Sequence, residues 1–185
     1  MAIKHSPRIV TDGLVAHYDA ANTKSYPGSG TTWKDISGNG NDGTLTNGIT
    51  YSSENGGVLV LNGTSDYVVT GSVMFNANSN FTFSMWFNSD DFSEQKALVA
   101  DADNSQSLFL RYNSGIQVVN SNTAVLGSFT SSTLSTNTWH NVTVTRSSNT
   151  YTLYVDGNFK STVSTSQSFS HSPCLLYTSP SPRDG

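Results

Sequence analysis

The chain has 185 residues, of which 35% are hydrophobic and 12% are charged, and its net charge is −4. This length suits one domain, and nine scattered Lys and Arg residues do not form the basic patch that a nucleic acid partner requires. No apolar run reaches the roughly 20 residues of a membrane-spanning helix, so we expect no membrane insertion.

Abundant Ser, Thr and Asn, at 30, 22 and 18 residues, predict short strands and tight turns in place of helices. A first strand is predicted over residues 13–19, and residues 20–48 are predicted to be mostly loop. Residues 58–61 and 67–70 are two further strands, and they flank the turn 62–66, whose Asn-Gly pair tolerates a positive φ.

Residues 81–87 give the clearest strand prediction, because apolar and polar side chains alternate along them. One face of this strand carries Phe81, Phe83, Met85 and Phe87, and the other carries Thr82, Ser84 and Trp86. The further predicted strands are 97–100, 107–112, 117–119, 125–129, 140–146, 151–155 and 158–160. The last two strands enclose Asp156-Gly157, which is typical of a tight hairpin turn. Strands spaced about ten residues apart predict an antiparallel two-sheet β-sandwich.

Four motifs occur in an order that resembles laminin G-like, concanavalin A-like jelly-roll domains. They are Leu-Asn-Gly-Thr-Ser-Asp-Tyr-Val at 61–68, the strand 81–87, Trp-His-Asn-Val-Thr-Val at 139–144 and Leu-Tyr-Val-Asp-Gly at 153–157. The stretches 18–22 and 33–43 look like the opening of such modules in viral and bacterial surface proteins. The resemblance implies an all-β jelly roll over residues 13–173, preceded by an arm over 1–12.

The C-terminal segment 174–185 differs from this pattern. Its sequence Cys-Leu-Leu-Tyr-Thr-Ser-Pro-Ser-Pro-Arg-Asp resembles the translation of a sequencing-library adapter. We expect the natural sequence to be interrupted near Pro173 and the jelly roll to be incomplete. The resemblance then implies that the first strand, residues 13–19, lacks its neighbour and leaves an unpaired edge. The only cysteine, Cys174, lies in this segment and gives no information on disulfides.

Catalysis has weak support in the sequence. Glycoside hydrolysis needs two carboxylates at a defined separation, and the only glutamates, Glu54 and Glu94, lie in predicted loops. None of the four histidines has a Gly-x-Ser-x-Gly partner. His140 shares its strand face with Val142 and Val144, which favours a partly buried, hydrogen-bonded imidazole over a catalytic base. A hydrolase remnant stays open as an alternative.

Calcium is the cofactor hypothesis. Asp101, Asp103 and Asn104 lie in a predicted loop between two strands and carry the hard oxygen ligands that Ca²⁺ prefers. The resemblance implies an acidic or Asn ligand in the matching loop, which we assign to Asp103 and Asn104 and less directly to Asp101. The alternative is a polar turn held by side-chain hydrogen bonds.

Sugar recognition needs an aromatic ring for stacking and planar polar groups for hydroxyls. Residues of these types in or beside predicted loops are Tyr26, Trp33, Tyr112 and Asn113. Trp86 and Trp139 match positions that are mainly structural in the resembled family, and we assign neither to a ligand.

We therefore predict a non-catalytic module that recognises a glycan or another cell-surface ligand through loops at one sheet edge. The resemblance implies a viral or bacterial adhesion or structural protein at an extracellular or virion surface, although the N-terminus shows no signal peptide. One shallow site is weak, so several copies on a parent polypeptide are expected. The alternative is a structural spacer without a ligand.

Overall fold

The structure is a computed structural model that describes residues 9–70, 79–92, 96–101, 108–112, 116–120, 124–129, 134–164 and 174–177. Its first strands are β1 (Thr32–Trp33), β2 (Gly43–Thr46), β3 (Thr50–Ser52), β4 (Val58–Val60), β5 (Tyr67–Thr70), β6 (Phe81–Phe87) and β7 (Lys96–Asp101). The remaining strands are β8 (Leu108–Tyr112), β9 (Ile116–Asn120), β10 (Ala124–Phe129), β11 (His140–Ser147), β12 (Thr150–Val155), β13 (Asn158–Ser164) and β14 (Cys174–Tyr177). One short 3-10 helix, η1 (Glu54–Gly56), occurs in the described part of the chain.

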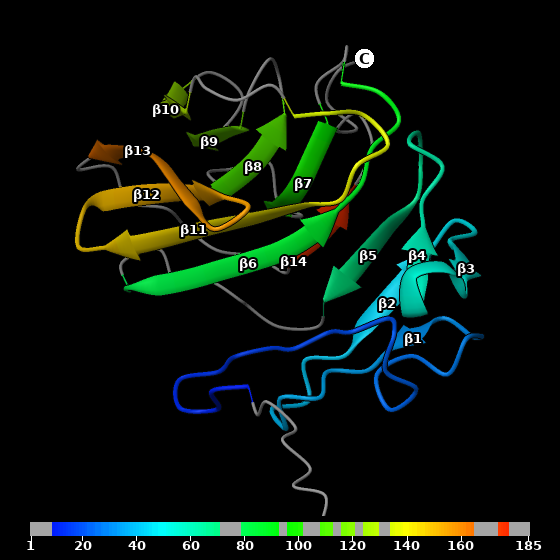
Figure 1. The fold of residues 1–185 in the computed structure, drawn as a ribbon. Coiled ribbons are helices and arrows are strands. Elements are labelled where there is room, and N and C mark those ends of the chain that lie inside the picture. The colour runs from blue at the N-terminus through cyan, green and yellow to red at the C-terminus, as the bar shows by residue number, and fades with distance from the viewer. Residues whose placement is uncertain are drawn as a thin grey trace, which may run out of the picture.

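Two antiparallel sheets form the body of the molecule. One has the strand order β13-β12-β11-β6, and the other has the order β1-β2-β5-β14-β7-β8-β9-β10. Strands β3 and β4 form a separate two-stranded sheet. In Figure 1 the four-stranded sheet lies in front of strands β7 and β8. The predicted all-β jelly-roll sandwich is therefore confirmed.

The core lies between the two sheets and follows the predicted alternation. In β11 and β12 every second residue is buried, with Val142, Tyr151 and Leu153 at 0%, 0% and 1% exposure. The opposite sheet contributes Leu98 and Val99 from β7 and Ile116 from β9 to the same cluster. The hairpin turn between β12 and β13 has the expected positive φ angles, 51° at Asp156 and 73° at Gly157.

The predicted first strand, residues 13–19, is wrong. This segment runs alongside the loop 35–42 without forming a ladder, because side-chain amides take the place of a partner strand. Asn39 Nδ2 donates to Leu14 O at 2.7 Å, and Asn41 Nδ2 donates to Val15 O at 2.8 Å. The amides of Asn39 and Asn41 therefore anchor the N-terminal segment.

The turn 62–66 reverses the chain as predicted, but its flanking strands do not pair with each other. Strand β4 pairs with β3, whereas β5 pairs with β2 and β14. Inside the turn, Asn62 Oδ1 accepts hydrogen bonds from the backbone of residues 64–66, and Asp66 Oδ2 accepts one from Asn62 N at 3.0 Å. The buried carboxylate of Asp66 thus holds the turn.

Strand β14 lies within the segment whose sequence looks foreign. It is antiparallel to β5 on one side, with Leu176 opposite Val68, and to β7 on the other, with Leu175 opposite Ala100. The strand therefore occupies an interior position of the larger sheet, between β5 and β7.

The carboxylate of Asp35 ties the loop 35–42 to the N-terminal segment. Its Oδ1 accepts from His17 N and Ser37 N at 2.9 and 2.8 Å, and its Oδ2 accepts from Ser37 Oγ and Asn41 N at 2.7 and 3.1 Å. Burial raises the pKa of Asp35, but these hydrogen bonds outweigh burial and hold the pKa below its ordinary value of 3.8.

We expect Asp35→Asn to lower the free energy of unfolding by about 1–3 kcal/mol at neutral pH, because an amide nitrogen then faces backbone donors. Because the pKa of Asp35 is lowered on folding, the ionised carboxylate stabilises the folded state above pH 3.8. This stabilisation is lost as the pH falls through the folded-state pKa. The difference between wild type and variant should therefore shrink below pH 3.8 in urea unfolding. A difference that does not depend on pH would show that the carboxylate charge is not involved.

Candidate functional site

The outer face of the four-stranded sheet carries exposed aromatic rings. Trp86 on β6 is 64% exposed and Phe159 on β13 is 60% exposed. Tyr154 on β12 is half-buried, opposite Phe159 in the register, and the two rings pack edge to face with centroids 6.1 Å apart. The inward positions of these strands form the core, so alternation turns Trp86 and Tyr154 toward solvent, whereas Phe159 reaches the same face through the register shift in β13.

Trp86 and the Tyr154–Phe159 pair stand at opposite sides of strand β11. Trp86 lies opposite Asn141, and Tyr154 lies opposite Thr143. Two strand spacings and a two-residue offset separate the Cα atoms of Trp86 and Tyr154 by about 12 Å. The rings therefore bound a platform whose middle belongs to β11.

Short polar side chains form the middle of this platform and hydrogen-bond to one another. Asn141 Nδ2 donates to Ser84 Oγ at 3.2 Å and to Met85 O at 3.3 Å. Thr143 Oγ1 donates to Asn141 Oδ1 at 3.1 Å and lies 2.8 Å from Ser84 Oγ. This network holds the polar groups in place between the rings without any charge.

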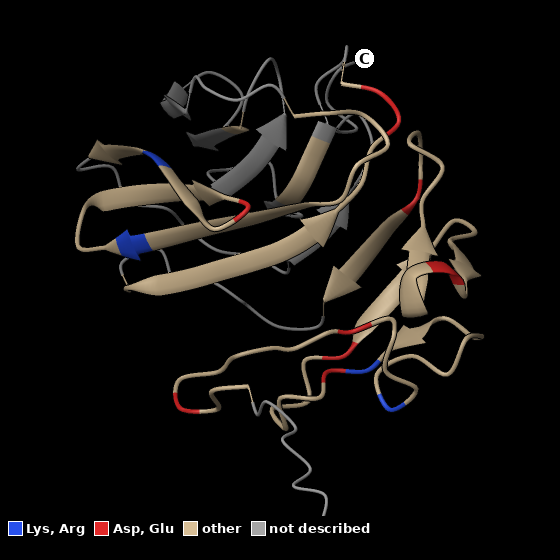
Figure 2. Ribbon diagram, in the orientation of Figure 1, with Lys and Arg blue, Asp and Glu red and all other residues tan. Residues whose placement is uncertain are grey.

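A row of threonines continues the face beyond the aromatic platform. Each of the four strands contributes one threonine in register, and these are Thr82, Thr145, Thr152 and Thr162. In Figure 2 the ribbon of this sheet is mostly tan, with blue on β11 and β13 and red at the β12–β13 turn, whereas acidic residues are concentrated in the N-terminal part of the chain. The face is therefore rich in hydroxyl groups and poor in charge.

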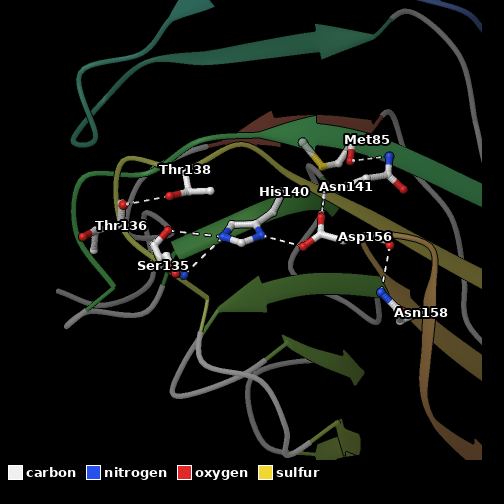
Figure 3. A network of polar contacts seen from close by, with 8 residues as sticks. All are labelled: Met85, Ser135, Thr136, Thr138, His140, Asn141, Asp156 and Asn158. Atoms are coloured by element: carbon white, nitrogen blue, oxygen red, sulfur yellow. Dashed lines mark hydrogen bonds and ion pairs between the residues drawn. The ribbon is translucent and has the colours of Figure 1, made fainter.

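Asp156 anchors the end of β11 that carries Asn141 (Figure 3). Its Oδ2 lies 2.9 Å from His140 Nδ1, and its Oδ1 accepts from Asn141 N at 2.8 Å. Burial raises the pKa of Asp156, but the hydrogen bonds from His140 and Asn141 outweigh burial and lower the pKa below 3.8. The carboxylate thus joins the β12–β13 turn to the polar network of the platform.

His140 is hydrogen-bonded as predicted and is buried, at 7% exposure. With the proton assigned to Nδ1, the ring donates to Asp156 and accepts at Nε2 from Ser135 N, 3.2 Å away. Ser135 contacts the imidazole through its backbone and not through its hydroxyl, as Figure 3 shows. Among the described residues, therefore, no serine hydroxyl is hydrogen-bonded to His140 as it would be in an activated nucleophile.

Of the residues predicted to bind sugar, Tyr26 and Trp33 lie in one small apolar cluster. Tyr26 is 3% exposed and donates its hydroxyl to Gly30 O, so its ring is not available for stacking, contrary to expectation. Trp33 is half-buried against the same small cluster, where its ring lies 5.3 Å from that of Tyr18. Tyr112 ends β8, five positions from the strand of Trp33 in the sheet, and its side chain is outside the described residues, as is all of Asn113.

The calcium hypothesis remains a prediction. Asp101 ends β7, but its side chain lies outside the described residues, as do Asp103 and Asn104. Among the residues that are described, no group of three or more His, Cys, Asp or Glu side chains could hold a metal ion.

Trp86 is the residue of this platform that the sequence reasoning set aside. The alternation over 81–87 already placed it on the face with Thr82 and Ser84, opposite the core residues. Family position indicated a structural role, whereas alternation indicated exposure, and the 64% exposure agrees with the alternation.

Comparisons with known proteins agree with the fold. The family model described as the concanavalin A-like lectin/glucanases superfamily matches residues 62–178, which is more than half of the chain. No curated protein sequence matches the chain. Within the described residues, no helix is long and apolar enough to cross a membrane.

Several solved structures share this fold at low sequence identity. Domain 4 of AbnA, a GH43 extracellular arabinanase from Geobacillus stearothermophilus, was solved with arabinotriose; it is 16% identical with a TM-score of 0.63, covering 78% of this chain and 76% of that domain. The botulinum neurotoxin serotype D binding domain is 16% identical with a TM-score of 0.61, covering 80% of this chain and 41% of that one. The type C neurotoxin, whose cell entry depends on two ganglioside molecules, is 13% identical with a TM-score of 0.58, covering 85% of this chain and 43% of that one. The chain thus spans about two fifths of these toxin structures.

Proposed function

The chain belongs to the concanavalin A-like lectin/glucanases superfamily, and from this premise we propose that it is a non-catalytic carbohydrate-binding module. The proposed binding surface is the outer face of the four-stranded sheet. The observation that carries the proposal is the exposure of Trp86 and Phe159 beside an ordered polar network.

Sugars match this surface chemically. A pyranose or furanose ring has an apolar C–H face that stacks on an aromatic ring, and its hydroxyl groups exchange hydrogen bonds with short polar side chains. Exposed rings leave apolar area in water, and a stacked sugar would remove part of that area at about 25 cal/mol per Å². The Asn141, Thr143 and Ser84 side chains are already ordered, so little side-chain entropy is lost on binding.

The structural relatives support a ligand of this class. The arabinanase domain was solved with an oligosaccharide, and the type C neurotoxin interacts with gangliosides, which carry sugars. We further propose an extracellular setting, as in that arabinanase, on a parent polypeptide of viral or bacterial origin that presents several copies. One shallow platform binds near the millimolar range, about −4 kcal/mol, and multivalency would raise the effective affinity.

Replacing Trp86 with Ala is expected to lower the affinity for a bound glycan by about tenfold or more, because an aromatic contact contributes about 0.5–1.5 kcal/mol beyond the area that it buries. A glycan array probed with a multimerised form of the protein would identify the ligand, and titration would give the affinity ratio. The array would be run with and without calcium, which also tests the predicted ligands Asp101, Asp103 and Asn104.

Val60→Ala is the matched control, because Val60 is 47% exposed on β4, outside the four-stranded sheet. It should bind as wild type does. Equal binding by Trp86→Ala and wild type would rule out the sheet face as the site. Absence of binding to every glycan under both conditions would favour a structural spacer.

A further inference from the structure

We infer that the ligand of the four-stranded face is an uncharged polysaccharide whose chain lies across strands β6, β11 and β12. This inference rests on the proposed function and adds to it the charge and the extended form of the ligand. Three features of the face support the inference: the lack of charge at the outward positions, the spacing of the aromatic residues, and the hydrogen bonds among the polar side chains between them.

The outward positions of the face carry no charge. In β6, β11 and β12 these positions carry only Thr, Ser, Asn, Tyr and Trp, and the one charged residue of β13, Lys160, is half-buried at the register shift of that strand. The cation of β11, Arg146, points inward instead, where it is 5% exposed and donates to Ser79 O at 2.8 Å.

The nearest charges lie at the margin of the face and oppose each other in sign. Asp156 occupies the β12–β13 turn, and Lys160 lies in the irregular part of β13, close enough to lower the pKa of Asp156. An anionic sugar laid on this face would lose water from its carboxylate or sulfate and would meet only Lys160, whose charge Asp156 already offsets, so the desolvation is costly. The net charge of −4 adds repulsion. Charge complementarity therefore selects a neutral glycan.

The spacing of the aromatic residues favours an extended ligand. About 12 Å separates the Cα atoms of Trp86 and Tyr154, and strand β11 lies between them, so a chain of several sugar rings fits this span better than a single ring. A chain that stacks on Trp86 at one end and on the Tyr154–Phe159 pair at the other passes over Asn141 and Thr143. Affinity should therefore rise from the monosaccharide to an oligosaccharide long enough to reach both groups of rings.

The polar groups between the rings already bond to one another, through Ser84, Asn141 and Thr143. They offer remaining lone pairs to a sugar, but no charged donor or acceptor fixes one hydroxyl stereochemistry. Binding should therefore tolerate changes of hydroxyl configuration and should not weaken when salt screens charges, even near 1 M, where the screening length is about 3 Å.

The test is a titration of the full chain against two panels of soluble polysaccharides. The neutral panel contains a β-glucan, a galactomannan and an arabinan, and the anionic panel contains polygalacturonate and hyaluronate. Each is measured at low and high salt, with wild type, Trp86→Ala and Val60→Ala. A series from monosaccharide to hexasaccharide of whichever neutral polysaccharide binds completes the experiment.

The expected result is salt-independent binding to at least one neutral polysaccharide, weakened about tenfold or more by Trp86→Ala, with an affinity gain of about tenfold between monosaccharide and longer chains. If only the anionic panel binds, and if this binding is salt-sensitive and lost in Trp86→Ala, then the ligand is charged and the inference is wrong. The proposed site would still be supported by that result. A monosaccharide that binds as tightly as the hexasaccharide would overturn the extended chain. Neutral binding that Trp86→Ala leaves unchanged would overturn the proposed site itself.

Discussion

Truncation after Pro173 is expected to lower the free energy of unfolding by about 3–6 kcal/mol, at about 1 kcal/mol for each backbone hydrogen bond lost. The truncation removes β14, which pairs with β5 through three residues and with β7 through three residues. Two interior strands would then become edges with unpaired N–H and C=O groups. Because whole domains are stable by only about 5–15 kcal/mol, the truncated chain should be close to unfolding.

Urea unfolding followed by tryptophan fluorescence measures this loss, and a dye for exposed apolar surface reports the opened sheet. Truncation after Thr178 is the matched control, since it keeps the whole of β14. The product that ends after Thr178 should have the same urea midpoint of unfolding as the full chain. If the two products unfold at the same urea concentration, β14 does not hold the interior position between β5 and β7.

Tyr151→Ala should destabilise the fold by about 3–5 kcal/mol, the usual cost of deleting a buried aromatic side chain. Tyr151 is 0% exposed in the core between the sheets, and its ring packs edge to face against Phe81 at 6.3 Å. The guanidinium of Arg146 lies 5.6 Å from the ring centroid, so the substitution also leaves this buried cation without its aromatic neighbour. Thermal and urea unfolding would measure the change.

Tyr151→Phe separates the ring from its hydroxyl and should cost much less than Tyr151→Ala. Burial raises the pKa of Tyr151 above its ordinary value of 10.0, and the charge of Arg146 only partly offsets this. Because the pKa of Tyr151 is raised on folding, the neutral phenol contributes fully to stability below pH 10.0. This contribution is lost as the pH rises through the folded-state pKa. Tyr151→Phe should therefore resist alkali better than wild type, and equal alkaline sensitivity would contradict this role of the phenol.

Side-chain alternation was sufficient to predict the strands β6 and β11 of the four-stranded sheet and the faces that they bury. The patterns over 81–87 and 140–146 gave the correct strands and faces, because one face of each strand had to reach a core. The Asp156-Gly157 pair gave the hairpin for a local reason, since both residues adopt a positive φ. Strand faces and hairpin turns depend on residues that are close together in the sequence.

Pairing over longer distances was not accessible in this way. Residues 13–19 have a strand-like composition, but the side-chain amides of Asn39 and Asn41 bond to the carbonyl groups of Leu14 and Val15, which no periodicity records. Strands β4 and β5 flank one turn and yet join different sheets, because the partners of β5 come from residues 43–46 and 174–177.

Sequence predicts the candidate platform only in its strand faces. Alternation places Trp86 on the solvent-facing side of β6, and its 64% exposure agrees, whereas its family position indicates a structural role. Tyr26 lies in a predicted loop, but tertiary packing buries it, which no local pattern records. The predicted ligands Asp103, Asn104 and Asn113 lie outside the described residues.

The most direct test of the account is a map of ligand contacts by two-dimensional NMR of the isotope-labelled protein, titrated with an oligosaccharide identified on the array. We expect the largest shifts in the indole N–H signal of Trp86, the side-chain amide of Asn141 and the backbone amides of Tyr154 and Phe159. Shifts concentrated instead at residues 101–104 and 112–113, with these four signals unmoved, would contradict recognition by the sheet face and return the site to the loops.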